Sequence, residues 1–222
     1  MRRPYYGMEY GKTIRILTLI AIFNFILGYD TPIATLTGVA ILLLITYLYL
    51  SSKYGRKFLI EDIKKMLNFK GFNRILEVET GYGFIAIELA KNLEKGEVVG
   101  VDSTIGRVRI AEMNAKLEKQ EEKIKFLKMN PEELKFKEEE FDIVIVNLIT
   151  SRIPEEKRKR IILEMYRVAK RGGRIIIADT SVEKYLEVLK EKNAENILEI
   201  PLSLKTRICF YGRPKAVIVE KR

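Results

Sequence analysis

Two long apolar runs lie within the first fifty residues. Residues 16–28 (ILTLIAIFNFILG) are interrupted only by Thr18 and Asn24, and residues 33–50 carry no charge. A helix needs about 20 apolar residues to cross a bilayer, and both runs reach that length when their polar flanks are counted. The turn-forming stretch 28–32 (GYDTP) separates them. This pattern predicts a transmembrane helical hairpin.

Beyond residue 55, short apolar runs alternate with amphipathic stretches of helix length. We predict strands at residues 74–78, 98–101, 123–127, 141–146 and 174–178. We predict helices at residues 57–69, 84–93, 105–117, 155–169 and 182–192. We expect residues 197–210 and 216–219 to form a closing antiparallel pair.

Strands that alternate with helices are typical of the α/β class. We predict a doubly wound, mostly parallel seven-stranded sheet with an antiparallel closing strand, preceded by the transmembrane helical hairpin. The expected domains are a membrane anchor of two transmembrane helices at residues 1–52 and a second domain at residues 53–222.

Positive charges flank the hairpin at its two outer ends. Four basic residues lie within residues 2–15 and three within residues 53–57, whereas the connecting loop has none. The apolar hairpin predicts a location in the cell membrane. The positive-inside rule then places both termini and the second domain in the cytoplasm. A cleaved signal peptide is the alternative, but a second, longer apolar run directly after the first disfavours it. Six tyrosines near the same ends resemble an interfacial aromatic belt: Tyr5, Tyr6, Tyr10, Tyr47, Tyr49 and Tyr54.

Composition excludes several kinds of chemistry. The chain has no histidine, which excludes a histidine base, a histidine-containing triad and histidine metal sites. Its single cysteine, Cys209, forms no intrachain disulfide, and we expect no metal site. The net charge is +10, but lysines and arginines are interleaved with glutamates throughout, as on a solvated surface. The charge by itself therefore does not indicate nucleic acid.

A glycine-containing loop follows the first predicted strand. Residues 77–83 read EVETGYG and lead into a helix. In doubly wound sheets, ligands bind beyond the carboxyl ends of the strands. About twenty residues on, Asp102 ends the next strand, where a carboxylate is suited to accept both hydroxyls of a ribose. The GxGxxG pattern of dinucleotide-binding proteins is absent, as is the Gly-Lys-Ser/Thr of a P-loop.

The loop resembles motif I of class I S-adenosylmethionine-dependent methyltransferases, an acidic residue followed by x-G-x-G-x-G. Four further segments resemble the family in order and spacing: the acid of motif II, the stretch after strand three, motif IV at residues 141–147, and the helix and turn at residues 164–174. The resemblance implies S-adenosylmethionine as cofactor, with Asn130 facing the adenine. The cofactor-binding residues that it implies are Glu77, Glu79, Gly81, Gly83, Asp102, Ser103, Asn130 and Asn147.

One departure from the motif concerns Glu79, which replaces its first glycine. Its side chain would project toward the methionine portion of the cofactor. Three outcomes are open: the carboxylate pairs with the cofactor's ammonium group, obstructs the site, or turns to solvent.

Two features of the sequence bear on the acceptor of the methyl group: the motifs that are missing and the predicted hairpin. The Pro-Pro-aromatic continuation of nucleic-acid amino methyltransferases is missing after Asn147, and Cys209 falls in the predicted closing strands, so we expect no nucleic-acid partner. A domain held at a bilayer has a high effective concentration of membrane molecules. We expect a lipid, an isoprenoid or quinone-type molecule, or a membrane-protein side chain as acceptor. The alternative is a non-catalytic cofactor-binding or scaffold protein that retains the fold.

Overall fold

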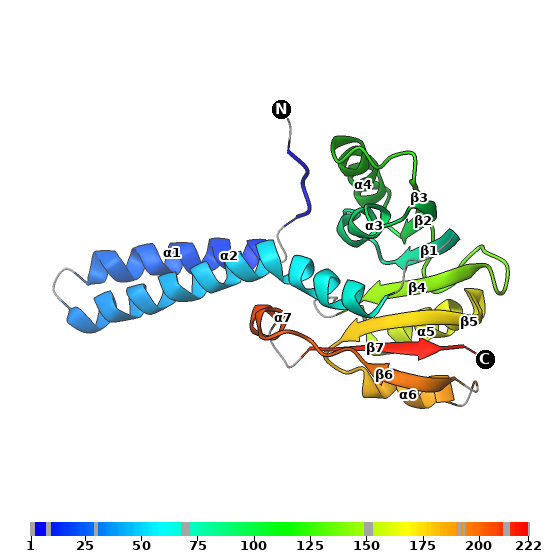
Figure 1. Ribbon diagram of the computed structural model, residues 1–222. Helices are drawn as coiled ribbons and strands as arrows, with labels where there is room; N and C mark the ends of the chain where they lie inside the picture. The colour runs from blue at the N-terminus through cyan, green and yellow to red at the C-terminus, as the bar shows by residue number, and fades with distance from the viewer. Residues whose placement is uncertain are drawn as a thin grey trace.

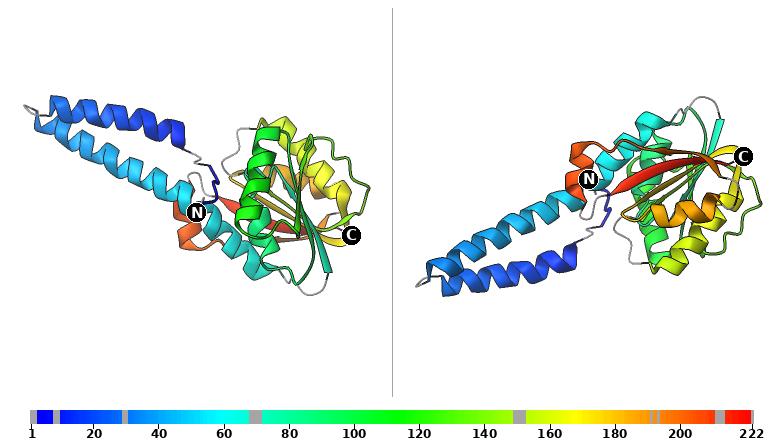
Figure 2. Two further views of the ribbon diagram at one scale, coloured as in Figure 1. Left: turned by 90° about the horizontal axis from the view of Figure 1, so that it is seen from above. Right: turned by 90° about the horizontal axis from the view of Figure 1, so that it is seen from below.

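The two apolar runs form the helices α1 (Gly11–Leu27) and α2 (Pro32–Met66). The computed structural model describes residues 3–7, 10–28, 31–67, 72–148, 153–190, 192, 194–210 and 214–221. The two helices lie antiparallel, side by side, and project away from the rest of the molecule (Figures 1 and 2). Most of the large apolar side chains that are exposed in the described residues lie on this hairpin.

Within the described residues, α2 is the one helix long and apolar enough to cross a membrane. Its most apolar stretch has a mean hydropathy of 2.2, and 6% of that stretch is buried inside the structure. Helix α1 has 17 residues, which at about 1.5 Å per residue gives about 26 Å. Because so little of the apolar stretch of α2 is buried, its apolar side chains lie on the outside of the structure, unlike those of a helix from the core of a globular domain.

Helix α2 continues without a break from the apolar run into the helix predicted from residue 57. The predicted domain boundary between residues 52 and 53 thus falls inside one helix, and Phe69 lies outside the described residues. Leu59, Ile60 and Ile63 near its end are fully buried against the sheet. A rigid helix therefore joins the hairpin to the sheet.

Seven strands form one sheet, in the order β3-β2-β1-β4-β5-β7-β6. The neighbours β1–β2, β1–β4, β2–β3 and β4–β5 pair in parallel, whereas β7 is antiparallel to both β5 and β6. The predicted sheet is confirmed, including its antiparallel closing strand. The strands are β1 (Phe72–Val78), β2 (Lys95–Asp102), β3 (Ile124–Lys128), β4 (Phe141–Asn147), β5 (Ala169–Asp179), β6 (Glu195–Glu199) and β7 (Lys215–Glu220).

Helices cover both faces of the sheet. The end of α2 packs on one face together with α3 (Phe84–Ala90) and α4 (Ile105–Leu117). Helices α5 (Glu155–Val168) and α6 (Glu183–Lys190) pack on the other. Both faces of β4 are buried, which explains its nearly unbroken apolar sequence.

The prediction of a strand over residues 197–210 is wrong for its second half. Strand β6 ends at Glu199, and α7 (Leu204–Cys209) follows as a helix. Pro201 has no N–H to donate to a ladder, so a strand is disfavoured there. The Ser203 side chain caps α7 by accepting from the Thr206 N–H, and the buried Asp62 of α2 accepts from the Thr206 hydroxyl at 2.7 Å. Cys209 consequently lies at the end of a helix and is half-buried.

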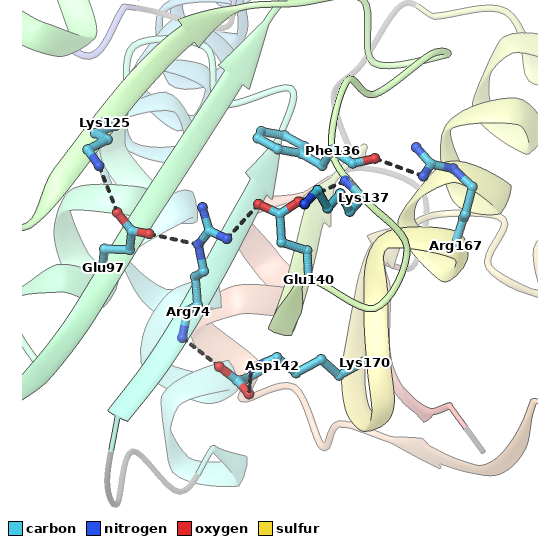
Figure 3. Close-up of polar contacts among 9 residues, drawn as sticks. All are labelled: Arg74, Glu97, Lys125, Phe136, Lys137, Glu140, Asp142, Arg167 and Lys170. Carbon is cyan, nitrogen blue, oxygen red and sulfur yellow. Dashed lines mark hydrogen bonds and ion pairs between the residues drawn. The ribbon is translucent and has the colours of Figure 1, made fainter.

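Ion pairs join the strands at their amino ends (Figure 3). The Arg74 guanidinium contacts the carboxylates of Glu97 at 2.7 Å and Glu140 at 2.5 Å. Its backbone N–H donates to Asp142, whose other oxygen pairs with Lys170 at 2.7 Å. These contacts thereby link four neighbouring strands, β2, β1, β4 and β5, at this edge.

The carboxyl ends of the parallel strands lie at the opposite edge. In Figure 1 the arrows of β4 and β5 point toward the side from which the hairpin leaves, and the arrow of β7 points away. The edge at which doubly wound sheets bind ligands therefore faces the hairpin.

Candidate active site

The loop after β1 takes a backbone shape that favours glycine. Gly81 and Gly83 have φ angles of 57° and 81°, in the left-handed region. A Cβ on Gly83 would lie 2.7 Å from the Phe126 ring and 3.0 Å from the Ala111 Cβ, so no side chain fits there. A Cβ on Gly81 would meet nothing within 4 Å. The loop thus packs tightly beneath Gly83 and is open above Gly81.

Asp102 joins the end of β2 to this loop. Its side chain is fully buried, with one oxygen accepting from the Gly81 N–H at 3.0 Å and the other from the Thr104 N–H at 2.8 Å. The Arg107 guanidinium of α4 lies 3.5 Å from the first oxygen. Because a carboxylate oxygen accepts two hydrogen bonds, both retain capacity once the half-exposed Arg107 swings away.

Glu77 has a supporting position under the loop. One of its carboxylate oxygens accepts from the Thr80 hydroxyl and from the Ala86 N–H, the latter at 2.8 Å. Burial raises its pKa to about 8, although these two hydrogen bonds act against the shift. The acid of the predicted motif therefore ties the loop to the first turn of α3.

Glu79 points into the same region as Asp102. Its φ is 59°, a left-handed conformation that costs a non-glycine residue about 1–3 kcal/mol. Its side chain is 13% exposed and lies 3.9 Å from Arg107. Burial, and then repulsion from Asp102, raise its pKa to about 7, while Arg107 acts to lower it. Two carboxylates therefore share one half-exposed arginine, which sequence reasoning missed because it lies on a helix outside the motif.

The remaining predicted residues lie around this centre. Val146 pairs with Val78, so Asn147 follows at the end of β4 beside Glu79. Ser103 is exposed directly after Asp102. Asn130 is exposed on the loop after β3, where its side chain accepts from the Glu132 N–H at 3.1 Å. The structure thus brings Glu77, Glu79, Gly81, Gly83 and Asp102 together, and the binding roles of all eight residues stay predictions.

A segment near the amino terminus lies across the glycine loop. The buried Asn114 of α4 bonds to both backbone groups of Tyr5, at 2.9 and 2.8 Å, and donates to the Tyr82 carbonyl at 2.9 Å. The Tyr5 ring lies 5.5 Å from that of Tyr82, and the Tyr6 ring packs edge-on against Phe84. These two tyrosines, interpreted above as part of an aromatic belt, therefore pack on the loop. Only the tertiary contact with Asn114 reveals this.

A second buried acid, Asp179, ends β5 at the same edge. It accepts from the Arg158 guanidinium, from the Tyr185 hydroxyl at 2.8 Å and from the Thr180 N–H. Burial, with the bond to Asp179, raises the pKa of Tyr185 to about 12. Because Arg158 lies on α5 and Tyr185 on α6, these bonds to Asp179 link both helices to the sheet. No sequence motif signalled it.

The residues at this edge fit an adenosyl cofactor. A buried carboxylate with spare acceptor capacity ends β2, and the backbone above Gly81 is open to a ligand. Glu79 adds a second negative charge beside it. Such a set of acceptors and negative charges suits ribose hydroxyls together with a cationic amino-acid group.

Comparison with known proteins defines the family. Residues 69–209 match the family model described as a methyltransferase domain. Because this covers more than half of the chain, the protein belongs to this methyltransferase family, whose cofactor is S-adenosylmethionine.

Curated relatives match part of their length. The chain is 30% identical over 122 residues to a demethylmenaquinone methyltransferase of Geobacillus sp. (strain WCH70), covering 54% of this chain and 51% of that protein. It is 33% identical over 129 residues to the arsenite methyltransferase of Homo sapiens, covering 53% of this chain and 34% of that protein. The chain thus spans about half the length, or less, of these relatives.

Solved structures share the fold. A putative S-adenosylmethionine-dependent methyltransferase from Methanococcus maripaludis superposes with a TM-score of 0.60 at 14% identity, covering 76% of this chain and 86% of that one. The [4+2]-cyclase SpnF superposes with a TM-score of 0.59 at 17% identity, covering 78% and 83%.

Proposed function

We propose that this protein is a membrane-anchored methyltransferase that moves a methyl group from S-adenosylmethionine to a quinone-type acceptor in the bilayer. One observation carries the proposal: the carboxyl edge of the sheet, where Asp102 and the glycine loop lie, faces the apolar hairpin. If the hairpin crosses a bilayer, the site opens toward that bilayer. An acceptor that is dissolved in lipid then reaches the site without leaving the membrane.

The flanks of the hairpin support the membrane anchor. Lys53 and Lys57 are exposed on α2 just beyond the apolar run. The Lys53 ammonium lies over the rings of Tyr49 and Tyr54, at 5.9 and 5.1 Å. Lysine and tyrosine are the residues that gather at membrane–water interfaces. We infer that the bilayer surface lies near residue 50 of α2, with both termini in the cytoplasm.

The names of several relatives support a quinone-type acceptor. Demethylmenaquinone methyltransferases of Geobacillus and Lactiplantibacillus plantarum match at 30% and 29% identity. Lipid and membrane-protein acceptors are other substrates that the same geometry would serve.

The chain's own groups have distinct roles in this proposal. S-adenosylmethionine supplies an electrophilic methyl group on a sulfonium. Asp102 would accept hydrogen bonds from the ribose hydroxyls once Arg107 has moved aside. The backbone at Gly81 would lie against the cofactor, and Glu79 would face its ammonium group. Such positioning is a main contribution that a protein makes to an in-line displacement.

The test uses the full chain in native membranes with methyl-labelled S-adenosylmethionine. We expect label in the lipid-extractable fraction and, on separation, in a quinone. The Asp102→Asn variant is the matched control, and at a limiting concentration of S-adenosylmethionine we expect it to transfer far less label. Label found only in soluble RNA or in small metabolites would refute the proposal.

A second candidate function, a non-catalytic cofactor-binding or scaffold protein, is favoured by Glu79. This carboxylate replaces a glycine and, with Arg107, lies in the cofactor region. The SpnF neighbour, named as a cyclase, illustrates that this fold serves other activities. Calorimetric titration with S-adenosylmethionine separates the two. We expect the natural chain to bind; no binding, with binding restored by Glu79→Gly, would show that the site is blocked.

A further inference from the structure

We propose that α7 is a membrane-surface element that seats the sheet on an anionic bilayer. This inference rests on the proposed membrane anchor and adds a second contact to it. The partner of α7 in this contact is the headgroup layer of the bilayer that surrounds the hairpin.

The position of α7 along α2 places it at the level of the membrane surface. The helix runs beside α2, from Asp62, which accepts from the Ser203 N–H at 2.8 Å, down to the last turns of the apolar run. There the Tyr47 hydroxyl donates to the Ile208 carbonyl at 2.8 Å, and the Ser51 hydroxyl donates to the Cys209 carbonyl. Ile208 therefore lies level with the cytoplasmic end of the apolar run.

The face of α7 that points away from the protein is apolar. Leu204 and Ile208 are four residues apart, so they lie on the same face of the helix, and they are 71% and 56% exposed. Thr206 lies between them in sequence, is fully buried and bonds to Asp62. A six-residue helix that exposes its two largest aliphatic side chains next to a transmembrane segment fits an apolar neighbour.

Basic side chains surround this face. Lys205 and Arg207 are exposed on α7, and Lys53 and Lys57 are exposed on the adjoining part of α2. The Lys205 ammonium lies 5.8 Å from the Phe58 ring. Glu61 is the exposed acid of this part of α2, and it lies one turn beyond Lys57, farther from the hairpin. Apolar side chains flanked by cations are the composition that binds anionic lipid surfaces.

A second contact would fix the orientation of the sheet. The hairpin by itself does not fix the tilt of the sheet relative to the bilayer surface. Helix α7 lies on the side of α2 where β6 and β7 are, as Figure 1 shows. Seating α7 in the headgroups would therefore limit that tilt and hold the carboxyl edge of the sheet over the bilayer.

The test measures the depth of single side chains in the full-length protein. Cys209 is the only cysteine, so Cys209→Ser yields a background in which Leu204→Cys, Ile208→Cys or Leu117→Cys carries one spin label. Leu117 is the matched control, because it is exposed at the far end of α4, near the amino ends of the strands. Each variant is reconstituted in nanodiscs of phosphatidylglycerol and phosphatidylcholine, one chain per disc.

We expect collisions of the Ile208 label with a water-soluble nickel chelate to be about fivefold fewer than those of the Leu117 label. We expect an intermediate value at Leu204. Joint replacement by Lys205→Glu and Arg207→Glu should return the Ile208 label toward the Leu117 value on these discs, and should change it less on phosphatidylcholine alone.

The outcomes separate the two proposals. Labels at positions 204 and 208 that are as accessible to the chelate as the label at 117, in protein that remains in the disc, would overturn the role of α7 and leave the anchor intact. Protein that does not enter the discs would overturn the anchor as well. Protection that appears only with two or more chains per disc would assign this face to a second copy and would also overturn the proposal.

Discussion

The carboxylates at the amino ends of the strands and the pair Glu79 and Asp102 at the glycine loop have opposite electrostatic surroundings. At the amino ends, burial would raise the pKa of Glu97, but Lys125 and Arg74 bind it and lower the pKa below its ordinary value. At the carboxyl ends, Glu79 and Asp102 share Arg107 at 3.9 and 3.5 Å, and the pKa of Glu79 rises to about 7. The first edge is paired for stability, whereas at the glycine loop two carboxylates lie near one arginine, an arrangement that suits a further positive charge.

This difference indicates which edge carries the function. Unsatisfied charge costs folding free energy, so its concentration at one place marks a site for a ligand. The side chains of Arg74 and its partners are mostly covered, whereas Arg107 is half-exposed. A cationic cofactor would pair with the carboxylates at the carboxyl edge, as lysine and arginine side chains already pair with those at the amino edge.

The largest effect is expected at Asp102. Asp102→Asn removes one of the two acceptor oxygens and the charge, and we expect the affinity for S-adenosylmethionine to fall about a hundredfold, the equivalent of about one hydrogen bond to a charged group. Calorimetric titration measures this. Glu140→Gln, at the opposite edge, is the control and should leave the affinity unchanged; an equal loss in both variants would contradict the assignment of the site.

Loss of Asn114 should be next in size. Asn114→Ala leaves the backbone groups of Tyr5 and the Tyr82 carbonyl without their partner. We expect the free energy of unfolding to fall by about 2–3 kcal/mol, because buried polar groups lose their hydrogen bonds. Urea unfolding in detergent micelles, followed by circular dichroism, measures it. Glu118→Gln, which weakens the 3.4 Å bond from the Tyr6 hydroxyl and the partly exposed ion pair with Lys91 at 3.1 Å, should cost far less.

A smaller effect should appear as a pH dependence of Glu79. Its folded pKa of about 7 exceeds the ordinary 4.5, so its contribution to stability is full below pH 4.5 and is lost as the pH rises through 7. Cofactor binding has the opposite dependence, because a cation favours the ionised form. From pH 6 to pH 8 the ionised fraction rises about tenfold, and we expect the affinity to rise by about as much.

The Glu79→Gln variant is the control for this pH profile. Glu77, whose pKa is about 8, titrates in both proteins, so only the difference between them reports on Glu79. Calorimetry at several pH values gives both profiles. Parallel profiles would show that Glu79 does not meet the cation.

The smallest effect is expected at the amino edge. Arg74→Met removes the contacts to Glu97 and Glu140, and we expect the free energy of unfolding to fall by about 1 kcal/mol with no change in cofactor affinity. Urea unfolding and calorimetry measure the two quantities. Arg171→Ala, which breaks a pair whose arginine is 79% exposed, should be nearly neutral. A change in affinity on removing Arg74 would mean that the two edges are coupled.

Periodicity predicted the elements well where one interaction dominates. The helix at residues 105–117 and the strand from residue 141 have the expected bounds, to within a residue, because burial on one or both faces dictates their pattern. It failed at residues 204–209. Apolar side chains occur there at helical and strand spacings alike, and the helix depends on Asp62, which is more than 140 residues away.

The sequence by itself determined the class of fold, the apolar hairpin and the glycine loop between two acidic strand ends. These follow from local order: the alternation of strands with helices, the length of an apolar run and the backbone freedom of glycine. Only the tertiary structure decided that Arg107 pairs with Glu79 and Asp102, that Asn114 holds Tyr5 across the loop, and that α7 lies beside the hairpin. Each of these contacts joins segments that are far apart in sequence or on different elements, and no local pattern encodes which distant side chain will be near.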